Sequence, residues 1–231
     1  MTIVRSLIFA AIFYLGSALF AILAFFESAL FPGRVIASCR RWAQWHRLCA
    51  KWILGIASEV EGALPQHAAL VAIKHQAHFE TFELLVLFDK PAVVMKKELV
   101  DIPIWGTLAK WHGVIAVDRD TGSTALRKML KAAKAAIEQD RPIIIFPEGT
   151  RTLVGAQPPL KSGLAGLYKT LRLPIVPIAL DSGRLCPRTG IMRKAGIVRW
   201  RVGETIPAGL PREEMEARVL AAINALNPPS M

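Results

Sequence analysis

Two histidines and two carboxylates gather where an apolar run gives way to a polar turn, in ALVAIKHQAHFETFE, residues 69–83. Histidine is the side chain that most readily exchanges a proton near neutral pH, and an adjacent carboxylate can fix its tautomer and support its protonated form. We therefore interpret His75 and Glu80 as a general base and its orienting partner. A solvated histidine and glutamate at the start of a helix would look the same in the sequence.

The five-residue spacing of this pair sets a condition on the local structure. Inside one α-helix, residues five apart point about 140° apart and cannot cooperate. If residues 74–78 form a turn and a helix starts directly after it, the ring of His75 can fold back onto Glu80. His78 and Glu83 have the same spacing but lie more fully in the predicted helix, so we prefer the first pair.

A second polar stretch, FPEGTR at residues 146–151, follows another apolar run. Gly149 permits a close approach of the backbone to a ligand, the hydroxyl of Thr150 can donate a hydrogen bond, and Arg151 offers a planar fork suited to phosphate oxygens. PEGT is also ordinary turn chemistry. Its position after a predicted strand, at the edge where α/β proteins bind ligands, favours a binding loop.

Three further charged residues are candidates for the same site. Glu148 would repel a phosphate, so we expect it to orient Arg151, Arg119 or a substrate hydroxyl. Arg119, in VIAVDRD, follows a different predicted strand and could add a second guanidinium. Lys161, before a predicted helix, could add another positive charge, although both Lys161 and Arg119 could instead be surface charges.

The elements that must position these residues alternate between strands and helices after residue 62, which predicts an α/β domain with a mostly parallel sheet flanked by helices. Residues 197–202 alternate apolar with basic residues, which suits an edge strand or a strand with one buried side. Prolines inside residues 173–180 also indicate an edge or a bulge. We predict strands at residues 69–73, 92–95, 114–117, 142–146 and 175–180, and helices at 79–88, 104–111, 123–139, 161–171 and 212–226.

An apolar segment precedes this domain. Residues 6–26 are uncharged and as a helix would extend about 32 Å, enough to cross a bilayer, and they exceed the usual core of a cleaved signal peptide. A second helix predicted at residues 35–57 has tryptophans on one side and basic residues on the other. It could lie among lipid headgroups or could simply cover the domain core. We therefore divide the chain into a membrane-associated helical segment, residues 1–61, and a catalytic domain, residues 62–231.

The composition narrows the class of partner. The net charge of +11 favours a polyanion, and the apolar amino terminus points to anionic lipid rather than nucleic acid. Basic residues are concentrated after the first predicted helix, which places the catalytic body on the cytoplasmic side of a membrane. The three cysteines lack C-x-x-C spacing, so neither a disulfide framework nor a zinc site is indicated.

These stretches, in this order, resemble the 1-acyl-glycerol-3-phosphate acyltransferases (lysophosphatidate acyltransferases) of the glycerolipid acyltransferase superfamily. The resemblance covers roughly residues 69–180 and includes a histidine, four residues and an acidic residue, an arginine in GVIAVDRD, the complete FPEGTR and VPIAL. It implies that His75 is the catalytic base and Glu80 its partner. It also implies that the glycerol phosphate is handled by Arg119, Glu148, Gly149 and Arg151.

The resemblance further implies the reaction. A fatty acyl group would move from acyl carrier protein (acyl-ACP) or acyl-CoA to the 2-hydroxyl of lysophosphatidic acid, giving phosphatidic acid at a bacterial inner membrane, with no metal or other cofactor. The chain has no G-x-S-x-G motif, and Cys186 has no evident base, so we expect direct transfer without an acyl-enzyme.

One departure from the family pattern leaves alternatives open. The acidic residue is usually aspartate in the family, whereas here it is Glu80, one methylene longer. The enzyme could instead use another acceptor, such as glycerol 3-phosphate or lyso-ornithine lipid. The chain could also be a membrane phospholipid-binding protein that has lost catalysis through the change at Glu80.

Overall fold

A single seven-stranded sheet organises the molecule, and the computed structural model describes residues 2–118 and 122–227. The strands are β1 (Ile56–Glu61), β2 (Leu70–Ile73), β3 (Ala92–Lys96), β4 (Ile115–Val117), β5 (Ile143–Ile145), β6 (Ile175–Leu180) and β7 (Gly196–Val202). Their order is β1-β7-β6-β2-β5-β3-β4, and all neighbours are parallel except β6 and β7. The mostly parallel sheet predicted from the sequence is confirmed.

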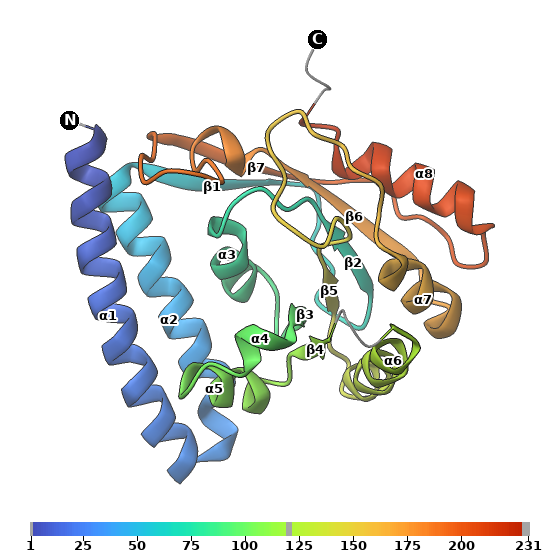
Figure 1. The fold of residues 1–231 in the computed structure, drawn as a ribbon, viewed down its shortest axis with the longest axis horizontal. Coiled ribbons are helices and arrows are strands. Elements are labelled where there is room, and N and C mark those ends of the chain that lie inside the picture. The colour runs from blue at the N-terminus through green and yellow to red at the C-terminus, as the bar shows by residue number, and fades with distance from the viewer. Residues whose placement is uncertain (1, 119–121, 228–231) are drawn as a thin grey trace.

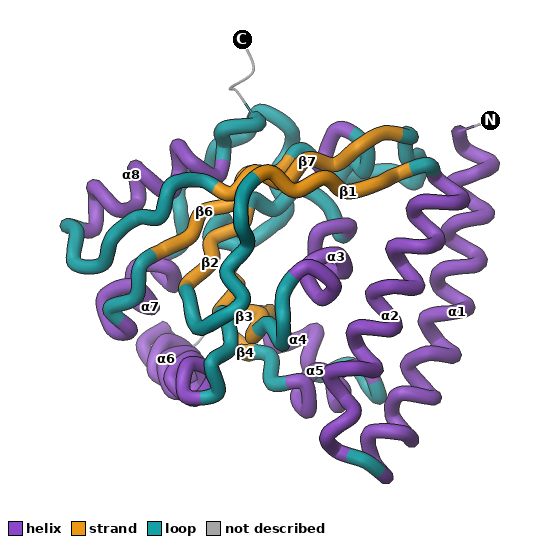
Figure 2. Tube along the Cα trace, turned by 180° about the vertical axis from the view of Figure 1, so that it is seen from behind, coloured by secondary structure: helices purple, strands orange, loops and turns teal. Residues whose placement is uncertain are grey.

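Helices cover both faces of the sheet (Figure 1). They are α1 (Thr2–Leu30), α2 (Val35–Cys49), α3 (Phe79–Leu87), α4 (Lys97–Val100), α5 (Trp105–His112), α6 (Gly122–Glu138), α7 (Ser162–Leu171) and α8 (Arg212–Ile223). One face carries α3, with the hairpin of α1 and α2 outside it, and the other carries α6, α7 and α8, an arrangement that Figure 2 shows from behind.

Strand β2 illustrates why the sheet needs both layers. Val71 and Ile73 are buried against the α3 side, whereas Leu70 and Ala72 are buried against the side of α6 to α8. Such a strand can form only where both faces are covered, which is why it reads as a continuous apolar run in the sequence. Where β2 ends, the apolar run gives way to the polar turn that carries His75, in which Lys74 and Gln76 stay buried.

The N-terminal segment is helical for most of its length. α1 is long and apolar enough to cross a membrane, and it is mostly exposed, in keeping with membrane association. The second predicted helix ends earlier than expected, because a π-helical turn, Ala50–Leu54, is closed by Gly55 in the left-handed conformation. Strand β1 then starts at Ile56 and pairs with β7, so the prediction that the second helix extends to residue 57 is wrong at its end. The division into two parts at residue 61 stays a prediction.

The apolar side of α2 faces protein rather than only lipid. Trp42 donates a hydrogen bond to Ser17 Oγ on α1 at 2.9 Å, and its ring meets that of Phe82 on α3 edge-on. Trp45 packs beside Phe20 of α1. The alternative that α2 covers the domain core is therefore correct for Trp42, whereas Trp45 packs on α1.

The basic residues of α2, and Arg34 directly before it, are also largely engaged within the protein. Arg34 and Arg41 pair with Glu27 of α1, and Arg47 pairs with the buried Glu83 of α3 at 2.7 Å. Glu83 therefore holds the two layers of helices together and is not the partner of His78.

The prolines and the basic strand near the C-terminus do not mark an edge. β7 lies inside the sheet between β1 and β6, although its burial alternates as predicted for a strand with one buried side. Pro177 lies in the central strand β6, and its carbonyl accepts from Gly203, one residue beyond the end of β7. A proline is tolerated there because the missing N–H points to the place where the β7 ladder ends.

Candidate active site

The turn between β2 and α3 brings the predicted base to the predicted carboxylate. α3 begins at Phe79, and His75 Nδ1 lies 3.0 Å from Glu80 Oε1, so the expected contact is confirmed. The imidazole stacks on the ring of Phe146, with centroids 4.1 Å apart. Because a carboxylate can only accept, the proton belongs on Nδ1, which leaves Nε2 of the partly exposed His75 ring able to take a proton from another molecule.

Glu80 is held rigidly although it is longer than aspartate. Its Oε1 also accepts from the backbone N–H groups of Gln76 and Ala77, each at 2.6 Å, and its Oε2 accepts from Ser182 Oγ at 2.8 Å. The carboxylate is fully buried, and all of its partners donate, which suits an ionised group. The extra methylene therefore does not prevent Glu80 from reaching His75.

The FPEGTR loop holds the backbone of His75 from the other side. Glu148 Oε2 accepts from His75 N at 3.0 Å, and Thr152 donates to His75 O through both its N–H, at 2.7 Å, and its hydroxyl, at 3.1 Å. Gly149 has a φ of +72°, and a side chain there would meet the stem of Lys161, so this position requires glycine. The two motifs thus form one site, and the loop fixes where His75 stands.

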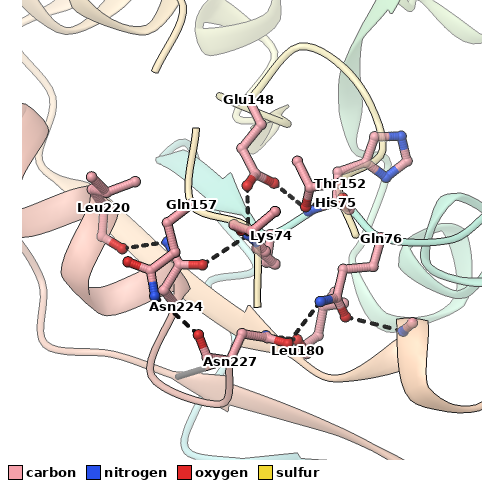
Figure 3. Close-up of polar contacts among 12 residues, drawn as sticks. Lys74, His75, Gln76, Glu148, Thr152, Gln157, Leu180, Leu220, Asn224 and Asn227 are labelled. Atoms are coloured by element: carbon pink, nitrogen blue, oxygen red, sulfur yellow. Dashed lines mark hydrogen bonds and ion pairs between the residues drawn. The ribbon is translucent and has the colours of Figure 1, made fainter. Parts of the chain in front are cut away.

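The sequence did not indicate Lys74 as a site residue, yet it is central to the site (Figure 3). Its side chain is fully buried, and Nζ donates to Glu148 Oε1 at 2.5 Å, Ala156 O at 2.8 Å and Asn224 Oδ1 at 2.8 Å. An ammonium has three N–H donors, so none is left for a substrate. A lysine directly after a fully apolar strand was the available signal, but its partners lie far away in the sequence.

Glu148 consequently has different partners from the arginine that the sequence suggested. Its oxygens are used by Lys74 and by the backbone of His75, and it makes no contact with Arg151 that the structure records among the residues it describes. The expectation that Glu148 orients Arg151 is wrong, because the buried ammonium of Lys74 is the closer cation. Its predicted contact with the substrate stays untested.

The remaining predicted residues lie around the mouth of the site. Arg151 is partly buried and makes no hydrogen bond or ion pair with any residue in the described ranges, whereas Thr150 and Lys161 are exposed. Lys161 precedes α7, and its stem lies against Gly149. Arg119 lies outside the described residues.

A small cavity of about 40 Å³ adjoins the turn at residues 74–78, which carries His75, on the side of α1 and α2. Its polar lining includes Tyr14, His46, His78, Arg151 and Arg193, and Arg193 stands in no motif that the sequence suggested. The backbone N–H of Arg193 donates to Ser6 Oγ at 2.9 Å, which ties its loop to α1. The rest of the lining is mainly apolar and includes Phe9, Phe13, Ala50, Leu54, Phe79 and Phe82.

Comparison with known proteins places this arrangement in a family. The family model described as Acyltransferase matches residues 57–181, more than half of the chain, and these residues include His75, Glu80 and FPEGTR. The chain belongs to the acyltransferase family.

Relatives of this acyltransferase are similar over different shares of its length. A 1-acyl-sn-glycerol-3-phosphate acyltransferase of Pseudomonas aeruginosa is 28% identical over 228 residues, which cover 96% of this chain and 86% of that protein. One from Cocos nucifera is 32% identical over 144 residues, covering 62% of this chain and 47% of the relative, so the match spans about half of the plant protein.

A solved structure shares the fold. The crystal structure of the 1-acyl-sn-glycerophosphate acyltransferase from Thermotoga maritima superposes with a TM-score of 0.78 at 20% sequence identity, covering 97% of this chain and 95% of that one. The likeness extends over the N-terminal helices as well as the sheet.

Cys186 of this acyltransferase is close to the site but is poorly suited to be a nucleophile. Burial raises the pKa of its thiol to about 12, so the thiolate is scarce near neutral pH. The side chain is buried and makes no hydrogen bond to a histidine within the described ranges. The geometry therefore favours His75 as the group that begins the reaction.

Proposed function

We propose that this acyltransferase moves a fatty acyl group from an acyl thioester, acyl-ACP or acyl-CoA, to the 2-hydroxyl of lysophosphatidic acid, producing phosphatidic acid. The observation that carries the proposal is that two parts of the chain meet. One is the pair of His75 and Glu80, and the other is the FPEGTR loop, whose Glu148, together with Thr152 directly after the loop, holds the backbone of His75. The names of the relatives from Pseudomonas aeruginosa and Cocos nucifera support the choice of acceptor.

The reaction follows from the placement of the two ring nitrogens. His75 Nε2 removes the proton of the acceptor hydroxyl while the hydroxyl oxygen attacks the thioester carbonyl, and Glu80 at Nδ1 supports the imidazolium that forms. The tetrahedral intermediate then expels the thiolate, which takes the proton from Nε2. A thioester is already an activated acyl group, so the proposed reaction involves no metal and no covalent enzyme intermediate.

Arg151 is proposed to bind the phosphate of the acceptor. It is partly buried at the mouth of the site, and no carboxylate pairs with it among the described residues. A guanidinium in that position can present two N–H groups to a phosphate. Thr150, Lys161 and Arg119 are proposed as further contacts, and Gly149 as the position that lets the loop approach the ligand.

The proposed location is a bacterial inner membrane, with the catalytic domain facing the cytoplasm. Exposed apolar α1 supports contact with lipid, where the acceptor resides, and the basic residues that follow it in the sequence support the orientation. The proposed partners are membrane phospholipid, lysophosphatidic acid and the acyl donor, with no role for nucleic acid.

A panel of acceptors tests the proposal. The purified full chain is given one acyl donor with lysophosphatidic acid, glycerol 3-phosphate or lyso-ornithine lipid, and the products are separated. We expect acylation of lysophosphatidic acid, and we expect His75→Ala to lower turnover by about 10²–10⁴ fold, since general base catalysis contributes that much. Acylation of the phosphate-free acceptor alone would overturn the choice of substrate, and near-normal turnover of His75→Ala would overturn the choice of base.

The change Glu80→Asp tests whether the longer carboxylate is functional. Aspartate is too short to keep the bond to His75 Nδ1 together with those to Gln76, Ala77 and Ser182, so we expect turnover to stay level or fall. If the chain were an inactive lipid-binding protein, the substitution would instead create activity in a protein that had none. The same acyl-transfer assay distinguishes the two outcomes.

A further inference from the structure

The C-terminal end of α8, by which we mean the turn at residues 224–227 that follows the helix, contacts the residues on both sides of His75 (Figure 3). Asn224, which directly follows α8, accepts a hydrogen bond from Lys74 Nζ through its Oδ1 at 2.8 Å. Asn227 accepts one from Gln76 Nε2 at 2.7 Å. Because Lys74 and Gln76 directly precede and follow His75, two asparagines hold the two neighbours of the proposed base.

A second hydrogen bond fixes the orientation of each asparagine. Asn224 Nδ2 donates to Leu220 O at 2.8 Å, and Asn227 Nδ2 donates to Leu180 O at 2.6 Å. An amide nitrogen can only donate and an amide oxygen can only accept, so these bonds direct each Oδ1 toward the catalytic turn. Both side chains are buried, and buried polar groups with all their partners form rigid networks.

The contacts continue from these asparagines to the backbone of His75. Lys74 Nζ donates to Glu148 Oε1 at 2.5 Å, and the other oxygen of Glu148 accepts from His75 N at 3.0 Å. The other polar atom of the Gln76 side chain is also hydrogen-bonded, since its Oε1 accepts from Gly183 N at 3.0 Å. Loss of Asn224 would leave one donor of a buried ammonium unsatisfied beside His75, and a shift of about 1 Å in a reacting group can cost on the order of 100-fold in rate.

We propose that the C-terminal end of α8 is a positioning element of the active site. Asn224 and Asn227 are positioning residues that act on His75 through Lys74 and Gln76, and neither touches the substrate. The inference rests on the proposed function only in that His75 is the base, and it is the same for any acyl acceptor.

The test compares two substitutions that shorten a side chain, one within α8 and one directly after it. Asn224→Ala removes a member of the network, whereas Val219→Ala shortens a fully buried core side chain of α8 outside it. We expect Asn224→Ala to lower kcat, corrected for the folded fraction, by about 10-fold while KM for the acceptor stays within about twofold. We expect Val219→Ala to lower the melting temperature but to leave kcat of the folded enzyme unchanged. Asn224→Asp keeps an acceptor for Lys74 but loses the donor to Leu220 O, so it should restore only part of the turnover.

A second measurement needs no substrate. The NMR chemical shifts of the His75 ring, compared at one pH, should change in Asn224→Ala and stay as in wild type in Val219→Ala. An unchanged kcat and unchanged chemical shifts of the His75 ring in Asn224→Ala would overturn the inference, as would losses of kcat in both variants that simply follow their melting temperatures. If the wild-type chain acylates a different lysolipid, the proposed function fails. The positioning test is then run with that lysolipid and still tests whether Asn224 positions His75.

Discussion

The turn that carries His75, residues 74–78, lies between two very different surroundings. Toward α8 it meets buried polar side chains, and Lys74, Gln76, Asn224 and Asn227 each have hydrogen bonds for their side-chain groups. Toward α1 and α2 it meets aromatic rings, and His46 Nδ1, buried among them, has no hydrogen-bond partner in the described part of the chain.

The difference indicates how each side contributes to the position of His75 and to the stability of the fold. Hydrogen bonds are directional, so the polar side can fix the position of His75, but a missing partner there is costly. Aromatic packing depends mainly on buried area and shape, so the helical side should tolerate a change of one apolar residue for another. Three substitutions test this contrast.

The largest effect is expected on the polar side. Lys74→Met leaves the buried carboxylate of Glu148 without its cation, and breaking such a pair costs about 3–5 kcal/mol of unfolding free energy. The double variant Lys74→Met/Glu148→Gln removes both charges and should recover most of that loss. Denaturant unfolding of wild type, the single variant and the double variant measures this, and equal stability of the single variant and wild type would contradict the contrast.

An intermediate effect, dependent on pH, is expected from His46. Burial, with a smaller contribution from the charge of Arg47, lowers the pKa of His46 to about 3. Between about pH 6.5 and pH 3 the unfolded chain binds a proton at His46 that the folded chain does not, so acid favours unfolding, by up to about 1.4 kcal/mol per pH unit. His46→Phe should flatten the fall in stability between pH 7 and pH 5.

The control for this prediction is a second buried histidine. His112 also has a lowered pKa, about 4, caused by burial and by Arg141, and it acts in the same direction. The free energy of unfolding of His46→Phe should therefore still depend on pH, but less steeply than that of wild type. A pH profile of unfolding identical to that of wild type would show that His46 does not lose its proton on folding.

The smallest effect is expected for an apolar exchange on the helical side. Phe13 of α1 is buried and contacts the rings of His46 and Phe82. Phe13→Leu keeps an apolar group there, so we expect a loss of about 1 kcal/mol in stability and no change in kcat. A fall in kcat similar to that of Asn224→Ala would mean that the aromatic side also positions the base.

The parts of the site that depend on nearby residues could be predicted from the sequence. The contact of His75 with Glu80 follows from a strand, a turn and a helix start within a dozen residues, and FPEGTR lies at the end of its strand as expected. Lys74 could not be assigned, because Asn224, one of its partners, is 150 residues away. No local pattern distinguishes a lysine that is buried and paired from one that faces solvent.

The errors in the fold have a similar origin. Apolar spacing carried the second helix past Gly55, and only the pairing with β7 makes Ile56 the start of a strand. The interior position of β7 depends on its pairing with β1 on one side, in parallel, and with β6 on the other, in antiparallel, which no alternation within residues 197–202 reveals. Arg47 looked like a lipid-facing cation because its partner Glu83 lies in another helix.

The link between Lys74 and Asn224 also has a consequence for synthesis of the chain. At about 5–20 residues per second, 150 residues require roughly 8–30 s of translation, so the ribosome makes both catalytic motifs well before the asparagines that hold the turn. A nascent chain that already carries His75 and FPEGTR therefore lacks the contacts that fix its base. On the proposed role of Asn224 and Asn227, the enzyme reaches its full turnover only late, when the end of α8 has emerged and folded onto the sheet.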